Sequence, residues 1–444
     1  EIIKDKKIKL LLLAIENLST NQKKKILNQI AHFPIEVRII SSLEKMISGE
    51  INLNTKKVEV EDILGRKIVQ PSQRLMEKNI SNKSILVTGA GGSIGSELCK
   101  QIIKLNPKIL VLFDHSEFAL YEINQDIEKK NLDISIFPVL GSVTDFNLFY
   151  NILKKYKINT VYHAAAYKHV PMVELNPIEG VVNNILGTYN CVKASMQHGV
   201  DRFILISTDK AVRPTNIMGA TKRFSELILQ GAQLTGTSTC FSMVRFGNVI
   251  DSAGSVVPLF RKQIKAHGPV TVTHPDITRY FMSIEEAVEL VIQAGAMAQG
   301  GDVFVLEMGE PIKIIELAKK MIYLSGFTPA FGDNLHGDIE IKVTGLRPGE
   351  KLFEELLIGE NVYSTDHPNI MQAKEKSIKW NEINKMIDIL DTLCEKFDIK
   401  GLVSFLKESI DGYKPADLDY DLIDGKVKLD SLADKLDTNI KGIS

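Results

Sequence analysis

The sequence predicts an α/β protein built on a doubly wound parallel sheet, with smaller α/β parts before and after it. Three observations lead to this prediction. A glycine-rich turn follows a short apolar run at 84–88, apolar runs then alternate with amphipathic segments to about residue 246, and the alternation breaks beyond that point. Alternating strands and helices form a parallel sheet that helices cover on both faces. Ligands bind beyond the carboxyl ends of such strands, so functional residues are expected there.

Short apolar runs mark the strands of this sheet, because each run is too brief to form a helix. The expected strands lie near 84–88, 109–113, 134–139, 159–163, 203–207 and 239–246. We therefore place the main domain at 81–250, with segments near 275–310 returning to it.

Residues 1–80 are expected to form a separate small βαβ unit. Ile8 to Ile15 is expected to be a buried strand, Asn21 to His32 a helix and Glu36 to Ser41 another strand. These segments carry no glycine fingerprint, so we assign the unit no cofactor. The unit contains two groups of lysines: Lys4, Lys6 and Lys7, and Lys23 to Lys25. These lysines either face a membrane surface, flank a membrane-spanning helix or are solvated charges at the edge of the unit.

The chain beyond the main domain is expected to hold two further parts. Residues 251–375 are expected to form a smaller α/β region that binds the substrate, and 376–444 to hold C-terminal helices and a tail. Asn381 to Ile410 shows apolar residues at helical spacing, which predicts helices that face the core or another subunit. Asp417 to Ser444 mixes Asp, Lys and Gly, and we expect a partly ordered tail.

Composition excludes several classes of protein. The 444 residues carry a formal net charge of -1, which provides no basic field for nucleic acid. Four scattered cysteines fit a reducing cytosol, and none of the nine histidines shows metal-ligand spacing, so we predict no metal. No run approaches the ~20 apolar residues of a membrane span. The chain opens at Glu1 rather than Met, and we expect an upstream portion to precede it.

The glycine-rich turn has the features of a dinucleotide site. Gly89, Gly92 and Gly95 stand three residues apart, between an apolar run and an amphipathic segment. The first two glycines let the backbone turn and approach a pyrophosphate, and the third lets helix and strand pack closely. The N–H groups of the helix that opens near Ser93 and Ile94 then face the diphosphate.

An acidic residue closes the second expected strand. Asp114 lies 19 residues after Gly95, where a carboxylate accepts hydrogen bonds from the adenosine ribose and repels a 2′-phosphate. In the alternative interpretation, Asp114 is a helix N-cap. The pattern favours NAD over NADP.

Residues after the next two strands are further candidates for cofactor contact. Ser142 and Val143 would border the adenine, and the small side chains of Ala164, Ala165 and Ala166 let a ribose approach the backbone. Lys168 and His169 follow at once, and they either touch a ligand or only decorate a loop.

The fifth strand runs straight into Ser-Thr-Asp-Lys, with Thr208, Asp209 and Lys210 at its end. Here the chain resembles the extended short-chain dehydrogenase/reductases, and the Thr-Asp-Lys triplet narrows this to nucleotide-sugar 4,6-dehydratases. In that family a Tyr lies four residues before a Lys on the next helix. Lys222 takes the lysine place, where it would bind the nicotinamide ribose, but Met218 holds the tyrosine place. This departs from the family pattern, because a thioether neither gives nor accepts a proton.

The combination is most similar to the long, membrane-anchored UDP-N-acetylglucosamine 4,6-dehydratases of the polysaccharide biosynthesis family. The resemblance covers residues 84–375. It implies a hydro-lyase with a Rossmann fold that uses NAD and forms UDP-2-acetamido-2,6-dideoxy-hexos-4-ulose for bacterial surface glycans or protein glycosylation, including bacillosamine synthesis. It also implies a full-length protein tethered at the cytoplasmic face of the inner membrane and a homo-oligomer, a dimer or higher.

The chemistry explains why an adjacent acid and base are needed. A 4,6-dehydratase moves a hydride from C4 of the sugar to NAD+, eliminates water across C5 and C6, and returns the hydride to C6. Elimination needs an acid and a base beyond the oxidation machinery, whereas 4-epimerisation does not. We assign Lys210 as the C5 base and Asp209 as the acid for the C6 hydroxyl. Thr208 is the first candidate to relay the C4 hydroxyl proton, to Asp209 or to water.

The resemblance also implies a set of substrate contacts. Asn248 matches the family's diphosphate- or sugar-contacting Asn, and Val257 and Gln263 suit a uracil ring. Two arginines converging on a diphosphate make physical sense, because planar guanidinium forks match phosphate oxygens. The predicted substrate-binding residues are Lys168, His169, Asn248, Val257, Gln263, Thr271, Arg279, Arg347 and Glu350.

Two other readings compete with dehydration of UDP-N-acetylglucosamine. A nucleotide-sugar 4-epimerase shares the fold and cofactor, but it normally needs the Tyr that Met218 displaces and has no use for the Asp209-Lys210 pair. A non-catalytic NAD-binding scaffold is the third reading. The sequence leaves the stereochemical outcome at C5 open, since proton return to either face uses the same residues.

Overall fold

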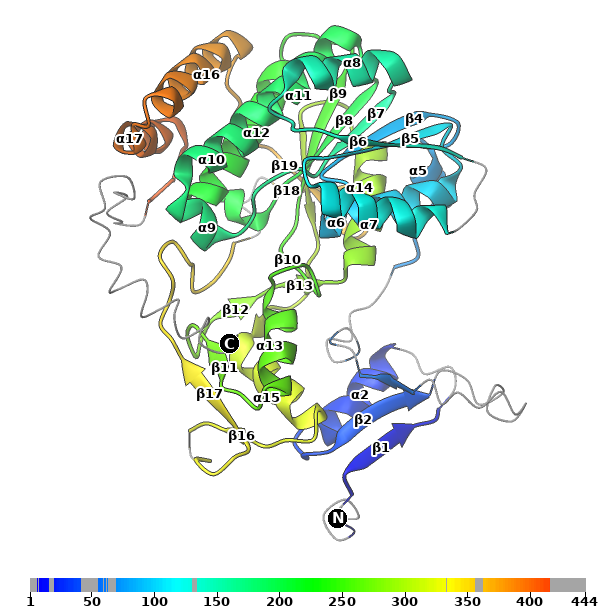
Figure 1. Cartoon of the computed structure of the whole chain (residues 1–444), viewed down its shortest axis with the longest axis vertical. Helices are drawn as coiled ribbons and strands as arrows, with labels where there is room; N and C mark the ends of the chain where they lie inside the picture. The colour runs from blue at the N-terminus through cyan, green and yellow to red at the C-terminus, as the bar shows by residue number, and fades with distance from the viewer. Residues whose placement is uncertain are drawn as a thin grey trace. The chain divides into compact units, whose positions relative to one another are not determined.

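The computed structural model describes residues 6, 8–15, 20–40, 55–58, 60, 62, 69–129, 134–332, 334–355 and 362–415 (Figure 1). The chain divides into two compact units. The main unit comprises Pro71–Gly247, Ala287–Glu307 and Arg347–Ser444, and the second unit comprises Glu1–Gln70, Asn248–Glu286 and Met308–Leu346. The predicted domain boundaries stay a prediction. The predicted tail at Asp417 to Ser444 lies outside the described residues, as do Lys4, Lys7 and Ser41.

The main unit is built on one large sheet. Within the described part of the chain this sheet has nine strands, in the order β18-β19-β14-β9-β8-β7-β4-β5-β6. The strands are β4 (Ser84–Thr88), β5 (Ile109–Asp114), β6 (Ser135–Leu140), β7 (Thr160–His163), β8 (Arg202–Ile206), β9 (Cys240–Arg245), β14 (Asp302–Leu306), β18 (Val362–Ser364) and β19 (Ile370–Ala373). The six predicted strands are confirmed as β4 to β9, each within one residue of its predicted ends.

The sheet is doubly wound, as predicted. All pairings from β14 across to β6 are parallel, while β19 and β18 add an antiparallel edge. From β4 the chain moves outward through β5 and β6, and it then crosses back to place β7 on the other side of β4. The switch in direction therefore lies between β4 and β7, where open α/β sheets bind ligands.

Helices cover both faces of the sheet (Figure 1). One face packs on α8 (Phe146–Tyr156), α11 (Gly187–His198) and α12 (Ile217–Gln233), and the other on α6 (Ser93–Ile102), α7 (Glu117–Glu128) and α14 (Ile284–Met297). Phe203 and Leu205 of β8 join the core beneath α11 and α12, whereas Ile204 points to the opposite face, where it meets Gly295 of α14. This alternation is what a strand buried on both sides requires.

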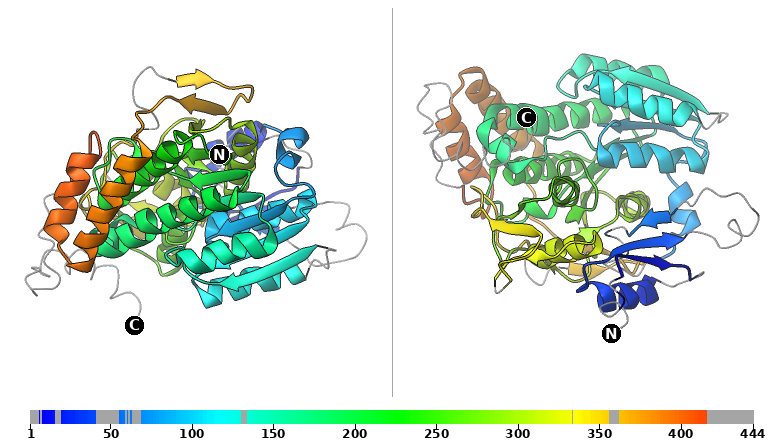
Figure 2. Two further views of the ribbon diagram at one scale, coloured as in Figure 1. Left: turned by 90° about the horizontal axis from the view of Figure 1, so that it is seen from above. Right: turned by 60° about the horizontal axis from the view of Figure 1, so that its bottom comes forward.

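The predicted C-terminal helices are α16 (Trp380–Glu395) and α17 (Ile399–Ser409), which lie beside the helices of one face (Figure 2). Ile383, Ile387 and Leu390 are buried in the same core as α12. Ile389 lies outside this buried stripe, and its side chain is 46% exposed. Residue 389 is about 100° around the helix from Leu390 and about 200° from Ile387.

The second unit begins with the predicted βαβ arrangement. Its elements are β1 (Leu10–Leu13), α2 (Thr20–Ile30) and β2 (Glu36–Ile40), with β1 and β2 parallel, and β3 (Thr55–Lys57) pairs antiparallel with β2. The expectation of a buried first strand is wrong, because Leu10 and Leu12 are both 45% exposed. The strand lies at the sheet edge. Leu13 is buried in the core that Leu27 and Leu324 help to form, and the partly buried Leu11 packs against that core.

The rest of the second unit is a smaller α/β assembly, as predicted. Its helices are α13 (Val256–Lys265) and α15 (Ile314–Leu324), and its strands are β10 (Asn248–Val249), β11 (Val270–Val272), β12 (Thr278–Arg279), β13 (Phe281–Met282), β15 (Ile312–Lys313), β16 (Pro329–Ala330) and β17 (Ile339–Val343). The strands β11, β17 and β16 form one parallel sheet. No helix in the described ranges is long and apolar enough to cross a membrane.

A buried ionic network ties α12 to the strands of the main unit. The Glu226 carboxylate accepts hydrogen bonds from Arg245 at 2.7 and 2.6 Å, from Arg223 at 2.9 Å and from the Ser207 hydroxyl at 2.7 Å. Arg245 also donates to Glu375 at 2.6 Å. Burial raises the pKa of Glu226, but the charges and hydrogen bonds of Arg245, with those of Arg223 and Ser207, outweigh burial and lower it to about 2.

Replacing Leu390 by Ala is expected to lower the free energy of unfolding by about 2–5 kcal/mol, because it leaves a cavity where α16 meets the core. Ile389→Ala is the matched control, and its exposed side chain predicts a change of about 0.5 kcal/mol or less. Urea unfolding followed by circular dichroism measures both values. Equal effects of the two substitutions would contradict this packing.

Replacing Glu226 by Gln is expected to lower the free energy of unfolding near neutral pH by about 3–5 kcal/mol, because the buried Arg245 and Arg223 then share only the carboxylate of Glu375. The ordinary pKa is 4.5 and the folded value about 2, so the stability that Glu226 contributes is complete above pH 4.5 and disappears as the pH falls toward 2. Denaturant titrations across this range should therefore show a flatter pH dependence for the variant. Glu355→Gln, at a more exposed carboxylate, is the control, and a wild-type slope in E226Q would refute the assignment.

Candidate functional site

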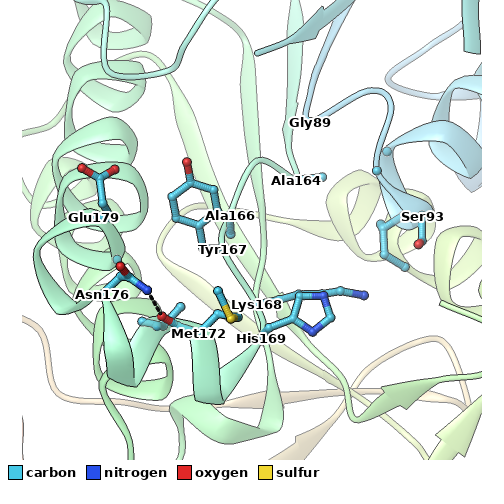
Figure 3. A pocket seen from close by; sticks show the side chains of 15 residues that line it. Gly89, Ser93, Ala164, Ala166, Tyr167, Lys168, His169, Met172, Asn176 and Glu179 are labelled. Atoms are coloured by element: carbon cyan, nitrogen blue, oxygen red, sulfur yellow. Dashed lines mark hydrogen bonds between the residues drawn. The ribbon is translucent and has the colours of Figure 1, made fainter. Parts of the chain in front are cut away.

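A cavity of about 540 Å³ opens at the switch point between β4 and β7 (Figure 3). One wall is the glycine turn, with Gly89, Ser93 and the residues up to Gly95. Another wall comes from the segment after β7 and from the helices α9 (Val170–Leu175) and α10 (Pro177–Val181). Part of the predicted cofactor set lines this cavity, namely Gly89, Gly92, Ser93, Ile94, Gly95, Ala164 and Ala166.

The glycine turn is shaped by close approaches of backbone to backbone. A Cβ at Gly95 would lie 1.9 Å from the Gly89 carbonyl oxygen, and a Cβ at Gly89, where φ is +63°, would lie 2.8 Å from the Ala165 nitrogen. Only glycine fits these two positions. The turn leads into the first residues of α6, whose N–H groups lack partners within the helix, so the turn fits a diphosphate group.

Asp114 holds this turn in place. Its buried carboxylate accepts hydrogen bonds from the Gly91 N–H at 2.8 Å and from the Ser116 N–H at 2.9 Å. The N-cap of α7 is Ser116, whose hydroxyl accepts from the Ala119 N–H, so the alternative interpretation of Asp114 as the N-cap is wrong. Its contact with a ribose stays a prediction.

The two residues predicted to border the adenine differ in their surroundings. The Ser142 hydroxyl lies 2.8 Å from the Thr144 hydroxyl, which makes it part of the turn after β6. Val143 is buried in the core, where a Cβ at Gly187 would come within 2.7 Å of it. Neither belongs to the lining of the cavity, and their contact with a cofactor stays a prediction.

A chain of hydrogen bonds links the glycine strand to the loop at Ala164, Ala165 and Ala166. The Thr188 hydroxyl donates to the Asn184 carbonyl at 2.6 Å, so its oxygen accepts from His163 Nε2–H at 3.0 Å. The other ring nitrogen then accepts from the Thr88 hydroxyl at 2.8 Å, and Thr88 accepts from the Ala165 N–H. Burial, aided by the charge of Lys222, lowers the pKa of His163 to about 3, so the ring is neutral. This tautomer is assigned from the hydrogen-bond partners.

Lys168 and His169 lie in the wall of the cavity, and Figure 3 shows both side chains next to Met172. Partial burial lowers the pKa of Lys168. Burial also lowers the pKa of His169, and the neighbouring charge of Lys168 adds to that shift. The position of Lys168 and His169 in the cavity wall favours contact with a ligand over a purely structural place in a loop. The contact itself stays a prediction.

The Thr-Asp-Lys triplet forms one hydrogen-bonded cluster at the carboxyl end of β8. The Thr208 hydroxyl donates to Asp209 Oδ1 at 2.9 Å, and Lys210 Nζ donates to the same oxygen at 3.0 Å. Asp209 is 1% exposed, and its Oδ2 is buried with no hydrogen-bond partner among the described residues. A buried carboxylate oxygen whose hydrogen-bonding capacity is unsatisfied is suited to carrying a proton to or from a ligand.

The segment from Arg347 to Glu355 packs against this cluster within the main unit. Glu354 Oε1 lies 3.5 Å from Lys210 Nζ, and Lys351 Nζ donates to the Val212 carbonyl at 2.9 Å. Glu350 Oε2 accepts from the Arg347 N–H at 3.1 Å, so these two predicted substrate contacts share one turn.

Met218 and Lys222 lie one turn apart on α12. Met218 is buried in the core, and Lys222 is buried as well. Desolvation by burial lowers the pKa of Lys222 to about 8, against the opposing effect of the Glu226 charge. A partly desolvated ammonium suits the predicted contact with the hydroxyls of a ribose.

The remaining predicted substrate residues belong to the second unit. Gln263 and Thr271 contact each other: the Gln263 amide donates to the Thr271 hydroxyl at 2.8 Å and accepts from the Thr271 N–H at 3.1 Å. Val257 is fully buried in α13, and Arg279 donates to the Thr278 carbonyl. The roles of these residues and of Asn248, and the convergence of Arg279 with Arg347, stay predictions.

Sequence reasoning missed Glu354, His163 and Asn184. Asn184 lies on a π-helical turn, Val182–Leu186, and its side chain bonds both the N–H and the C=O of Tyr167, which fixes the loop after β7. Glu354 follows the predicted Arg-Pro-Gly-Glu-Lys motif by three residues, and no sequence pattern pairs it with Lys210. Over the described residues, no cluster of three or more His, Cys, Asp and Glu side chains could hold a metal ion.

Comparison with known proteins agrees with this fold. The family model described as "Polysaccharide biosynthesis protein" matches residues 85–375. The capsular polysaccharide biosynthesis protein CapD of Staphylococcus aureus is 48% identical over 360 residues, which are 80% of this chain and 59% of that protein. The chain thus spans about three fifths of that relative's length. Proteins named UDP-glucose 4-epimerase, from Rickettsia species, are also among the relatives.

Solved structures share the architecture. Pen from Bacillus thuringiensis aligns with a TM-score of 0.60 at 30% identity, covering 70% of this chain and 98% of that one. DesIV of Streptomyces venezuelae, described as a dTDP-glucose 4,6-dehydratase with NAD and TYD bound, aligns with a TM-score of 0.53 at 19% identity. That alignment covers 62% of this chain and 88% of that one, and it shows the fold alone. The chain has the Rossmann-type fold of the short-chain dehydrogenase/reductases, and it belongs to the polysaccharide biosynthesis protein family.

Proposed function

We propose that this chain catalyses the NAD-dependent 4,6-dehydration of UDP-N-acetylglucosamine to UDP-2-acetamido-2,6-dideoxy-hexos-4-ulose. The observation that carries the proposal is the cluster of Thr208, Asp209 and Lys210 at the carboxyl end of β8. Oxidation of a sugar alcohol alone does not use an adjacent acid and amine, whereas elimination of water does. The product would serve the synthesis of bacterial surface glycans or of glycosylated proteins, bacillosamine among them.

The residues around the glycine turn fit NAD. The turn and the first residues of α6 would hold the diphosphate, Asp114 the adenosine ribose, and Lys222 the nicotinamide ribose. When bound, NAD+ supplies a hydride acceptor for C4, and the reduced cofactor returns that hydride to C6. The NAD-bound structural neighbour supports this choice of cofactor.

The chain's own residues would manage the protons. Met218 takes no part, so the C4 hydroxyl proton would pass through the Thr208 hydroxyl to Asp209, which already accepts from Thr208 at 2.9 Å. Asp209 would then give this proton to the departing C6 hydroxyl from Oδ2, the oxygen that has no hydrogen-bond partner within the described chain. The proton lost from C4 would thus leave in the water that is eliminated.

Lys210 in its neutral form would take the C5 proton, which the new C4 ketone acidifies, and would later return a proton to C5. Asp209 and Lys210 would both regain their starting protonation states in each turnover. Exchange of the Lys210 proton with solvent would label C5.

The resemblance to membrane-anchored dehydratases supports two wider proposals. The full-length protein would be tethered at the cytoplasmic face of the bacterial inner membrane, and the enzyme would work as a homo-oligomer. A nucleotide-sugar 4-epimerase is the second candidate function, and the relatives of that name favour it. Met218 argues against an epimerase, because it replaces the Tyr that a 4-epimerase normally needs.

Incubation with NAD+ and UDP-N-acetylglucosamine in deuterated buffer, followed by NMR of the product, tests the proposed function. We expect a 6-deoxy-4-keto sugar with deuterium at C5, and a loss of about 10²–10⁴-fold in rate for Asp209→Asn. Glu395→Gln, at an exposed carboxylate on α16, is the control. Formation of the C4 epimer would favour the second candidate, and a folded protein that binds NAD but forms no product would contradict both.

Replacing Thr208 by Val is expected to slow turnover by about 100-fold, because the C4 hydroxyl proton loses its route to Asp209. Thr208→Ser keeps the hydroxyl and should retain most of the activity. Steady-state rates of ketone formation measure both variants. Unchanged turnover in T208V would remove Thr208 from the mechanism.

A further inference from the structure

We propose that Glu354 is a positioning residue for Lys210, which holds the lysine amine between two buried carboxylates so that it faces the sugar. This inference rests on the proposed function, because it concerns the group assigned as the C5 base. Glu354 contacts that group from the segment 347–355, which is distant in the sequence from the loop after β8.

The contact is well buried. Lys210 Nζ lies 3.0 Å from Asp209 Oδ1 and 3.5 Å from Glu354 Oε1. The side chains of Asp209 and Glu354 are 1% and 3% exposed, whereas that of Lys210 is 19% exposed. The two acidic partners are therefore enclosed, whereas the lysine side chain is partly exposed.

Hydrogen-bond geometry gives this arrangement a consequence. A neutral amine has two N–H donors and one lone pair in tetrahedral directions. If Asp209 and Glu354 accept the two N–H groups, the lone pair points away from both carboxylates. Loss of the Glu354 acceptor removes one of these constraints, and the direction of the lone pair is then less restricted. Proton abstraction from carbon depends strongly on such orientation.

The segment that carries Glu354 is fixed to the catalytic loop at several points. The Gly349 carbonyl accepts from the Thr215 hydroxyl at 2.8 Å and from the Asn216 amide at 3.0 Å. Gly349 has φ of +71°, and a Cβ there would lie 2.8 Å from the Asn216 Cβ. Lys351 and Glu354 then add their contacts to the same loop. The contacts of Gly349 and Lys351 thus hold the segment that carries Glu354 without involving Lys210.

The proposed uridine diphosphate contacts, Arg347 and Glu350, lie on the same short segment. A nucleotide that binds them would engage the segment that positions Lys210. Nucleotide binding and orientation of the base would therefore share one structural element.

Two substitutions of Glu354 test the proposal against a control. Glu354→Gln keeps an oxygen acceptor at the same place, and Glu354→Leu removes it while filling the space. We expect E354L to slow deuterium incorporation at C5 by about 100-fold while C4 oxidation continues, so that reduced cofactor accumulates. E354Q should stay within about tenfold of the wild type. Glu395→Gln, at an exposed carboxylate on α16, should match the wild type in both steps.

A second measurement uses the protein without substrate or cofactor. Reductive methylation followed by peptide mass spectrometry reports how readily each lysine amine reacts. Loss of one buried ionic contact should make Lys210 react about tenfold faster in E354L, whereas Glu395→Gln, at an exposed carboxylate on α16, should leave it unchanged. In E354L the Lys210 amine would then react faster with the methylation reagent, but it would remove the C5 proton more slowly because it is less well oriented. A purely structural role for Glu354 does not predict these opposite changes.

Two outcomes would overturn the proposal: unchanged C5 exchange in E354L, or unchanged labelling of Lys210. Equal loss of C4 oxidation and C5 exchange would also overturn it, because positioning of the base affects only the second step. Failure of the proposed function would give a different result. The wild-type protein would then form no ketone, but Lys210 would still be methylated faster in E354L than in the wild type.

Discussion

The buried carboxylate of Glu226 constrains the rest of the main unit. An ionised carboxylate without water costs several kcal/mol unless charges and donors surround it. Here Arg245 of β9, Arg223 of α12 and Ser207 at the end of β8 supply those partners. The network therefore fixes how α12 lies against two neighbouring strands. Residue 208 follows Ser207 directly, and residue 222 precedes Glu226 by one turn, so the same contacts help to position the Thr-Asp-Lys cluster and Lys222.

The site combines groups that the sheet alone would not bring together. The parallel strands bring the glycine turn, the loop after β7 and the Thr-Asp-Lys cluster to one edge. Two further sets of contacts complete the arrangement. The His163 hydrogen-bond chain joins the glycine strand to the loop after β7, and the segment 347–355 packs against the Thr-Asp-Lys cluster. Each addition buries polar groups whose partners come from distant parts of the sequence. The environment of Lys210 is thus set by tertiary contacts rather than by its neighbours in the chain.

Local patterns were sufficient to predict the strands and the glycine turn. Six apolar runs predicted β4 to β9 because strands buried on both faces are continuous apolar segments. The same reasoning failed for Leu10 and Leu12, since apolar composition does not distinguish an edge strand from a central one. It could not find Glu354, because a contact between positions 144 residues apart leaves no periodicity. The departure at Met218 was visible in the sequence, but the carboxylate oxygen that suits a proton relay required coordinates.

Asp114 also limits how cofactor preference can be re-engineered. Both of its oxygens are already engaged with backbone N–H groups, one in the glycine turn and one at the start of α7. These hydrogen bonds hold the loop without a nucleotide, and such preorganisation reduces the entropy lost on association. A neutral or basic replacement meant to admit a 2′-phosphate would remove these two anchors together with the negative charge. Redesign toward NADP would therefore have to rebuild the loop as well as exchange the discriminating residue.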